Sequence, residues 1–463
     1  MPVLLISKWL SKERITASGD YNRWLVPPAA LCIHLCIGQI YAYSVFNNPL
    51  THIIGRSQPV EEDWDLKTVG WIFSIALFCL GASAATFGKW VERVGPRLTM
   101  FVSALCFSGG FMVAAVGVQF HQIWLLYLGN GVLGGIGLGL GYISPVSTLI
   151  KWFPDRPGMA TGLAIMGFGG GAMIGSPLAV WLMNYFRTSV SPGITETLIV
   201  MGFLYFILMM FGVWIVRIPS PGWKPLNYQP KVKTNMTTQS LTVDQAIRTP
   251  QFYLLFGVLM LNVTAGIGVL GQASVMIQEM FSPASVGAEH AVTEAAAAGF
   301  VGLLSLFNML GRFFWSSLSD WLGRRYTYLL FFTLGAVLYF LVPLSGQLQN
   351  IVLFVGLFCV ILSMYGGGFA TIPAYLKDLF GDKQVGAIHG RLLLAWSVAA
   401  LLGPVLVNYI RSYQIEVIGI PKANAYSTTM LIMSGLLIIG FILNLMIKPV
   451  HARFFAEPLK KQP

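Results

Sequence analysis

The stretch Glu92-Arg93-Val94-Gly95-Pro96-Arg97, followed by Thr99, recurs 228 positions later as Asp320-Trp321-Leu322-Gly323-Arg324-Arg325, followed by Thr327. The same offset relates further prolines and glycines: Pro145 and Pro373, Gly158 and Gly386, Gly162 and Gly390, and Gly175 and Gly403. Chance similarity does not keep one offset through several separate motifs. The chain is therefore an internal duplication, and parallel repeats of this size predict two homologous helical bundles that lie side by side.

The composition places these bundles in a lipid bilayer. Only 10% of the 463 residues are charged, against about 25% in soluble domains, while 56% are hydrophobic and 13% aromatic. Such a chain has too little polar surface to cover a water-soluble globule. Apolar stretches of about 20 residues predict an all-α membrane protein with twelve transmembrane helices, near residues 24–48, 67–88, 98–118, 123–150, 158–186, 196–217, 250–278, 294–318, 327–346, 350–376, 387–411 and 427–448.

A polar, proline-rich segment separates the two repeats. We expect an N-terminal six-helix bundle in residues 1–217, a cytoplasmic linker in residues 218–249 and a C-terminal six-helix bundle in residues 250–463.

The basic residues predict how the chain is oriented. If both termini are cytoplasmic, the cytoplasmic segments hold 22 of the 29 Lys and Arg residues and the outer segments hold five. This is the bias that sets membrane topology, so we expect a multi-pass protein of the plasma (inner) membrane with both termini inside. The net charge of +11 is then an asymmetry across the bilayer. We expect a monomer with the lipid bilayer as its surroundings and no nucleic-acid partner.

The sequence favours transport over catalysis. The five cysteines all fall within predicted spans, so they offer neither a disulfide framework nor a zinc-ligand spacing. The spans also lack a Ser/His/acid set or a pair of carboxylates. We therefore expect no enzyme activity, no metal and no cofactor. Two repeated bundles with a site at the midplane between them are the architecture of a transporter.

Arg312 is the charged residue that points to a substrate. It lies eight residues before Asp320, about 12 Å along a helix from the end of the span, where an unpaired guanidinium costs about 3 kcal/mol or more. No Asp or Glu lies deep in any span to neutralise it. An anionic substrate is the natural partner, because the planar guanidinium grips a carboxylate through two hydrogen bonds. Hydrogen bonds to backbone carbonyls and water are the alternative.

Three other ionisable residues fall inside spans. Arg391 lies about one turn into the eleventh span, where its side chain either reaches the substrate or extends to the membrane edge. His34 shares a helix face with Gly38 and Tyr41, so it is a candidate carrier of a coupling proton, as is His389. A histidine packed in the core with its polar atoms satisfied is the alternative.

The duplicated motif predicts a gating contact. A carboxylate at a helix end, Glu92 or Asp320, is followed by a glycine turn and by Arg97 or Arg325. Each pair can form a charge-assisted latch at the cytoplasmic rim, and such a latch favours one of two conformations. An ordinary solvated turn is the alternative.

This motif resembles the loop signature of the major facilitator superfamily, with Glu92 in place of the more usual Asp. Further motifs resemble the oxalate–formate antiporter family, which is related to the monocarboxylate transporters. They are Gly38-x-x-Tyr41-x-Tyr43-x-x-Phe46-x-Asn48-Pro49, Lys151-Trp152-Phe153-Pro154-Asp155-Arg156, Arg248-Thr249-Pro250-Gln251-Phe252, Leu306-Phe307-Asn308-x-x-x-Arg312-x-Phe314-Trp315 and Asp378-Leu379-Phe380-Gly381. The resemblance runs from the first span through the eleventh and implies the major facilitator fold.

The resemblance also implies a binding site, in which Arg312 corresponds to the family's anion-binding arginine. The family's aromatic cage corresponds to Tyr41, Tyr142, Tyr365 and Phe369, with Phe168 where the oxalate carrier has a tyrosine. Trp396 stands where the oxalate carrier has a lysine. Because a second buried carboxylate would then lack a positive partner, we expect monocarboxylates to be preferred over oxalate.

Together these features predict a secondary active transporter of small organic anions, above all monocarboxylates such as lactate, pyruvate or formate. We expect alternating access, coupled to proton symport or to anion exchange. A broader organic-anion or drug efflux carrier and a membrane anion sensor that does not transport are the alternatives.

Overall fold

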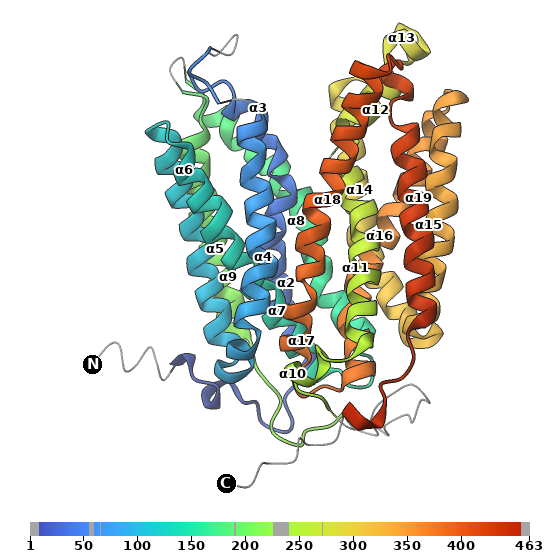
Figure 1. Ribbon diagram of the computed structural model, residues 1–463. Coiled ribbons are helices and arrows are strands. Elements are labelled where there is room, and N and C mark those ends of the chain that lie inside the picture. The colour runs from blue at the N-terminus through green and yellow to red at the C-terminus, as the bar shows by residue number, and fades with distance from the viewer. Residues whose placement is uncertain are drawn as a thin grey trace, which may run out of the picture.

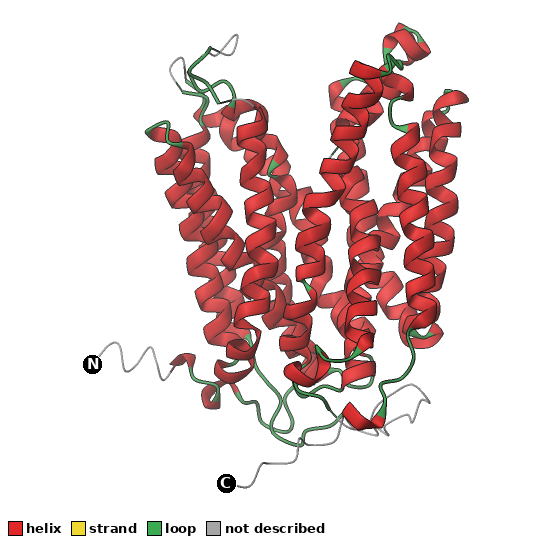
Figure 2. Ribbon diagram, in the orientation of Figure 1, coloured by secondary structure: helices red, strands yellow, loops and turns green. Residues whose placement is uncertain are grey.

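The computed structural model describes residues 9–54, 60–64, 66–188, 191–225, 240–270 and 272–454. Helices joined by loops make up this part of the chain (Figure 2). The predicted linker is described at its two ends only, because residues 226–239 lie outside the described residues.

The first half contains six membrane-spanning segments. Their elements are α2 (Val26–Ile37) with the 3₁₀ helix η3 (Gly38–Ala42) and α3 (Ser44–Leu50), α4 (Leu66–Val94), α5 (Pro96–Gln119), α6 (Ile123–Leu126) with the π-helix η4 (Tyr127–Leu133) and α7 (Gly134–Trp152), α8 (Pro157–Phe186), and α9 (Ile194–Ile215).

The second half follows the short helix α10 (Val243–Ala246) and repeats the pattern. Its elements are α11 (Pro250–Leu270) with α12 (Ala273–Met280) and α13 (Pro283–Val286), α14 (Glu294–Leu322), α15 (Arg324–Gln347), α16 (Ile351–Phe380), α17 (Val385–Leu392) with α18 (Leu394–Ser412) and the π-helix η6 (Tyr413–Val417), and α19 (Ser427–Met446).

The prediction of a helical membrane protein is confirmed. Eleven helical segments of the described residues are long and apolar enough to cross a bilayer. The remaining long helix is α14, with 29 residues, and it packs against α8 of the first half and α16 of the second. The twelve predicted spans therefore each have a helix.

Several spans are not single regular helices, and the first and the seventh differ from the prediction as follows. The first is not one regular helix, because it tightens to 3₁₀ at Gly38, where the backbone passes so close to the Phe168 carbonyl that an added Cβ would collide with it. The seventh ends earlier than expected, at Leu270, and continues as α12. The break at Gly38 is one that helix propensity alone does not predict, since it lies at a close contact with a neighbouring helix.

Figure 1 shows how the two halves are arranged. We call the lower end in that view, where α2 begins and α19 ends, the base, and the opposite end the top. The ribbons of the two halves lie together at the base and diverge toward the top. Contacts across the halves join α8 to α14 and α4 to α17 and α18. These helix pairs surround the buried residues described next.

Candidate functional site

Aromatic rings from both halves meet in the middle of the molecule. The Phe168 ring of α8 lies 5.0 Å from Tyr41, 5.7 Å from Tyr142 and 6.1 Å from Trp396, measured between ring centroids. The Phe369 ring of α16 lies 5.2 Å from Tyr142 and 5.3 Å from Trp396. The sequence analysis named all of these residues as one site, and they do lie together; we call them, with Tyr365, the cage.

Tyr365 completes the cage from α16. Its hydroxyl lies 3.3 Å from the hydroxyl of Tyr41, so this contact joins the two halves. Tyr142, Phe168 and Trp396 are fully buried, and Tyr365 and Phe369 nearly so. Tyr41 is half-buried, which makes it the cage residue nearest to solvent.

Arg312 of α14 lies against this cage with no side-chain exposure. Its guanidinium carbon is 5.5 Å from the Phe168 ring and 5.2 Å from the Phe369 ring, within cation–π range. Its Nε donates to Asn308 Oδ1 at 3.0 Å and its Nη1 to the Ile165 carbonyl at 3.3 Å. Arg312 forms no ion pair with any described residue, so its positive charge is balanced only by neutral acceptors and ring faces.

Two buried hydrogen-bond donors of this site have no partner among the described residues. They are Arg312 Nη2 and the Tyr142 hydroxyl. Buried polar groups are ordinarily paired, because an unpaired one costs about 1–3 kcal/mol. A cluster of unpaired donors around one positive charge is suited to an anion, which offers only acceptors.

Asn308 is a site residue that the sequence analysis did not identify as such. It lies one helical turn before Arg312 and orients the guanidinium through its amide oxygen. The signal was present in the motif Leu306-Phe307-Asn308-x-x-x-Arg312, because residues four apart face the same side of a helix.

The two candidate histidines are both buried at the site. Nδ1 of His34 contacts the Ala164 carbonyl and its Nε2 lies 3.3 Å from the Tyr142 carbonyl. A neutral imidazole carries one N–H, so it can donate to only one of these two carbonyls. The His389 ring packs 5.6 Å from the Tyr142 ring. Both residues therefore border the cage.

Arg391 lies on α17 and is half-buried. Among the described residues, no hydrogen bond, ion pair or ring contact joins it to the cage. The structure thus brings Trp396 into the cage, while a role of Arg391 at the site stays a prediction.

The gating pairs have different partners from those predicted. Glu92 does not pair with Arg97: its Oε2 binds Lys151 Nζ at 2.7 Å. Arg97 is buried and donates to the backbone carbonyls of Trp9, at 3.0 Å, and Val213, at 3.2 Å. Arg97 therefore ties the end of α9 to the N-terminal segment, because the last carbonyls of a helix lack partners within it.

In the second half, Asp320 pairs with Arg324, and Arg325 donates to the Leu445 carbonyl. The Asp320 carboxylate also crosses to the first half, where it accepts from Gly158 N at 2.9 Å and Met159 N at 3.0 Å. These amides are in the first turn of α8, whose positive dipole end favours an anion. Asp320 thus joins the two halves at the base, and its partners are Arg324 and the first turn of α8, not Arg325.

Two repeated sets of membrane helices, with a buried arginine and aromatic rings from both halves between them, define a membrane transporter fold. The chain belongs to the Major Facilitator Superfamily, whose sequence profile matches residues 29–404 and 267–461. It is accordingly a transporter and not an enzyme.

The relatives are distant in sequence. The chain is 23% identical over 383 residues to the uncharacterized transporter YhjX of Escherichia coli (82% of this chain, 86% of the relative), and 25% identical over 385 residues to the oxalate:formate antiporter of Oxalobacter formigenes (82% and 83%). It is 24% identical over 364 residues to the apicoplast pyruvate carrier 1 of Toxoplasma gondii (67% and 64%). The crystal structure of FucP in the outward conformation shares the fold, with a TM-score of 0.62, 12% identity and coverage of 94% and 100%.

Proposed function

We propose that this transporter is a secondary carrier of small monocarboxylates such as formate, lactate or pyruvate, moved by alternating access with proton symport or anion exchange. The observation that carries the proposal is the cluster of unpaired donors around Arg312. A carboxylate offers acceptors to Arg312 Nη2 and the Tyr142 hydroxyl together, and it neutralises the one buried charge of the cage.

The walls of the cage favour a small ligand with an apolar remainder. Phe168, Phe369 and Trp396 present ring surfaces, which accept a methyl group and leave no polar atom stranded. A dicarboxylate would bring a second charge, for which the cage offers no second cation. The similarity to an oxalate:formate antiporter and to a pyruvate carrier supports this substrate class.

The proposal extends to the two bundles, to the linker between them and to the orientation of the protein in the membrane. We infer that residues 1–217 and 250–463 move as two bodies joined by the linker in residues 218–249, and that the base faces the cytoplasm of a cell whose plasma membrane holds the carrier as a monomer. The excess of Lys and Arg in the segments of the base supports this orientation.

The decisive experiment is a binding and counterflow screen of formate, acetate, lactate, pyruvate, glyoxylate and oxalate on purified protein in proteoliposomes. Arg312→Gln should abolish carboxylate binding, and Arg312→Lys should retain only weak activity, since it keeps the charge but loses the planar fork. Arg391→Gln is the matched control and should retain binding. Wild-type affinity in Arg312→Gln would overturn the proposal.

The same screen separates the alternatives. A sensor would bind the anion without counterflow. A broad efflux carrier for larger organic anions would transport bulky compounds equally well, and its transport would not depend on Arg312.

A further inference from the structure

Gly266 of α11 lies directly behind the cage residue Tyr365. A methyl group added at Gly266 would lie 2.6 Å from Tyr365 Cγ and 2.9 Å from its Cβ, and would also collide with Cδ2. Carbon atoms in contact are normally about 3.5–4.0 Å apart. The tyrosine therefore occupies the space that any side chain at position 266 would need.

The backbone of α16 is not free to retreat from α11. On the side facing α14, a methyl group at Gly366 would lie 2.5 Å from Asn308 Oδ1 and 3.1 Å from Arg312 Cγ. Helix α16 is thus closely held by its neighbours on both sides. A side chain at position 266 would consequently displace the Tyr365 ring, whose hydroxyl already lies 3.3 Å from Tyr41 at the cage.

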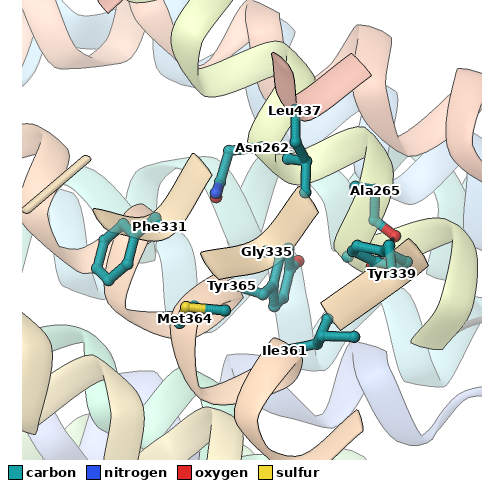
Figure 3. Close-up of a pocket in the computed structure, with 10 residues that line it drawn as sticks. Asn262, Ala265, Phe331, Gly335, Tyr339, Ile361, Met364, Tyr365 and Leu437 are labelled. Atoms are coloured by element: carbon teal, nitrogen blue, oxygen red, sulfur yellow. Dashed lines mark hydrogen bonds between the residues drawn. The ribbon is translucent and has the colours of Figure 1, made fainter. Parts of the chain in front are cut away.

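A cavity of about 20 Å³ borders the same ring, as Figure 3 shows. It is lined mainly by apolar residues of the second half, among them Ala265, Gly335, Met364 and Leu437. This volume is about that of one water molecule or methyl group. Tyr365 thus borders both the cavity and, through its contact with Tyr41, the cage.

We propose that Gly266 determines the size of the carboxylate that the site accepts. It does so by letting Tyr365 lie back against α11, which keeps space in the cage for the short aliphatic or 2-oxo chain of the substrate. This inference rests on the proposed function, since it assigns the substrate size of that same site.

The test is the size selectivity of Gly266→Ala, measured by competition binding with formate, acetate, pyruvate, 2-oxobutyrate and 3-methyl-2-oxobutyrate. Alanine is the better helix former, so α11 is not weakened by the change. The Tyr365 ring should move into the cage. Relative to wild type, the ratio of affinities for formate over 2-oxobutyrate should rise at least tenfold.

Two glycine variants serve as controls. Gly257→Ala lies on the same helix, where the added methyl meets only the end of the Leu443 side chain. Gly335→Ala adds a methyl group of α15 to the wall of the cavity, where it meets the ends of the Leu437 and Met364 side chains. Both should keep the wild-type ratio within threefold, because neither touches the tyrosine ring.

A double-mutant cycle tests whether the effect of Gly266→Ala on size selectivity is transmitted by Tyr365. In a Tyr365→Ala background, Gly266→Ala should change the formate to 2-oxobutyrate ratio less than threefold, because the ring that transmits the change is gone. A larger change there, or a rise of less than tenfold in the single variant, overturns the role of Gly266. Failure of the wild type to bind any of the carboxylates would instead overturn the proposed function, so the two failures are distinguishable.

Discussion

At the scale of single residues, the chemistry of the site depends on the buried positive charge of Arg312, which stays free to bind an anion. Arg312 is held by Asn308 and a backbone carbonyl, which are neutral acceptors. A carboxylate of the protein in their place would neutralise the guanidinium and compete with the substrate. The neutral surroundings therefore orient the arginine and preserve its attraction for an anion.

Trp396 is expected to determine whether the site prefers a ligand with one carboxylate or with two. Its ring packs on Phe168 and Phe369, so a second substrate carboxylate would be buried beside aromatic carbon at a cost of several kcal/mol. We expect pyruvate and lactate to compete more strongly than oxalate in the wild type. Trp396→Lys should raise oxalate affinity about tenfold or more, as measured by competition binding.

Arg391 is the control for that prediction. Because no hydrogen bond, ion pair or ring contact joins Arg391 to the cage among the described residues, Arg391→Gln should leave the preference for monocarboxylates unchanged. Tight oxalate binding by the wild type, unaffected by loss of Arg391, would contradict the prediction that Trp396 makes the site prefer monocarboxylates.

His34 is the residue on which a proton-coupled mechanism can be tested. Both ring nitrogens face backbone carbonyls, so proton uptake would complete a second hydrogen bond that the neutral ring cannot make. If transport is proton-linked through His34, His34→Gln should lose the response of uptake to an imposed pH gradient in proteoliposomes. The exposed His451 provides the control, as His451→Gln. A full response in His34→Gln would remove His34 from the mechanism.

At the scale of elements, the acids in the two copies of the duplicated motif form different hydrogen bonds. Asp320 accepts hydrogen bonds from the first turn of α8. The equivalent Glu92 faces the first turn of α17, where a methyl at Gly386 would lie 2.6 Å from its Oε1. That oxygen has no hydrogen-bond partner among the described residues. The acid of the motif therefore hydrogen-bonds across the two halves in one copy only, and we propose that Asp320 acts there as a latch.

Asp320→Asn should weaken this latch. An N-terminal helix cap is worth about 0.5–2 kcal/mol, and a change of about 1.4 kcal/mol is tenfold in population. We expect the closed state of the base to lose between about twofold and about thirtyfold in population, with carboxylate affinity little changed. Distances between spin labels at Arg93 and Lys383, exposed residues of the two halves, would measure the shift.

Glu92→Gln is the matched variant and should shift the same distances less. A loss of affinity in Asp320→Asn without any shift in the distance distribution would show that Asp320 acts on the ligand site and not as a latch.

At the scale of the whole molecule, the distribution of basic residues predicts which end faces the cytoplasm. We expect a cysteine at Lys224, at the base, to react with a membrane-impermeant maleimide only after cells are permeabilised. A cysteine at Glu289, exposed at the top, should react in intact cells. The experiment needs a background in which the five native cysteines are replaced. The reverse labelling pattern would invert the proposed topology.

The sequence by itself determined the membrane fold and singled out Arg312, whereas the aromatic residues of the cage were predicted only from the resemblance to a known family. Apolar stretches identify spans because the bilayer core penalises polar groups wherever they lie in a helix, and one repeat offset defines two halves before any contact is known. Likewise, an arginine with no acid at its depth requires a partner whatever surrounds it. These conclusions depend on the local sequence, so they hold without coordinates.

Only the tertiary structure decided the pairing of side chains. Arg97 lies five residues after Glu92 but binds the end of α9. The carboxylate of Glu92 pairs instead with Lys151, which is 59 residues away in the sequence. Asp320 lies 162 residues from its partner Gly158, and Gly266 meets Tyr365 although no motif connects them. The physical reason is that hydrogen bonds and close packing act over a few ångströms, and helix packing, not sequence separation, decides which groups come within that range.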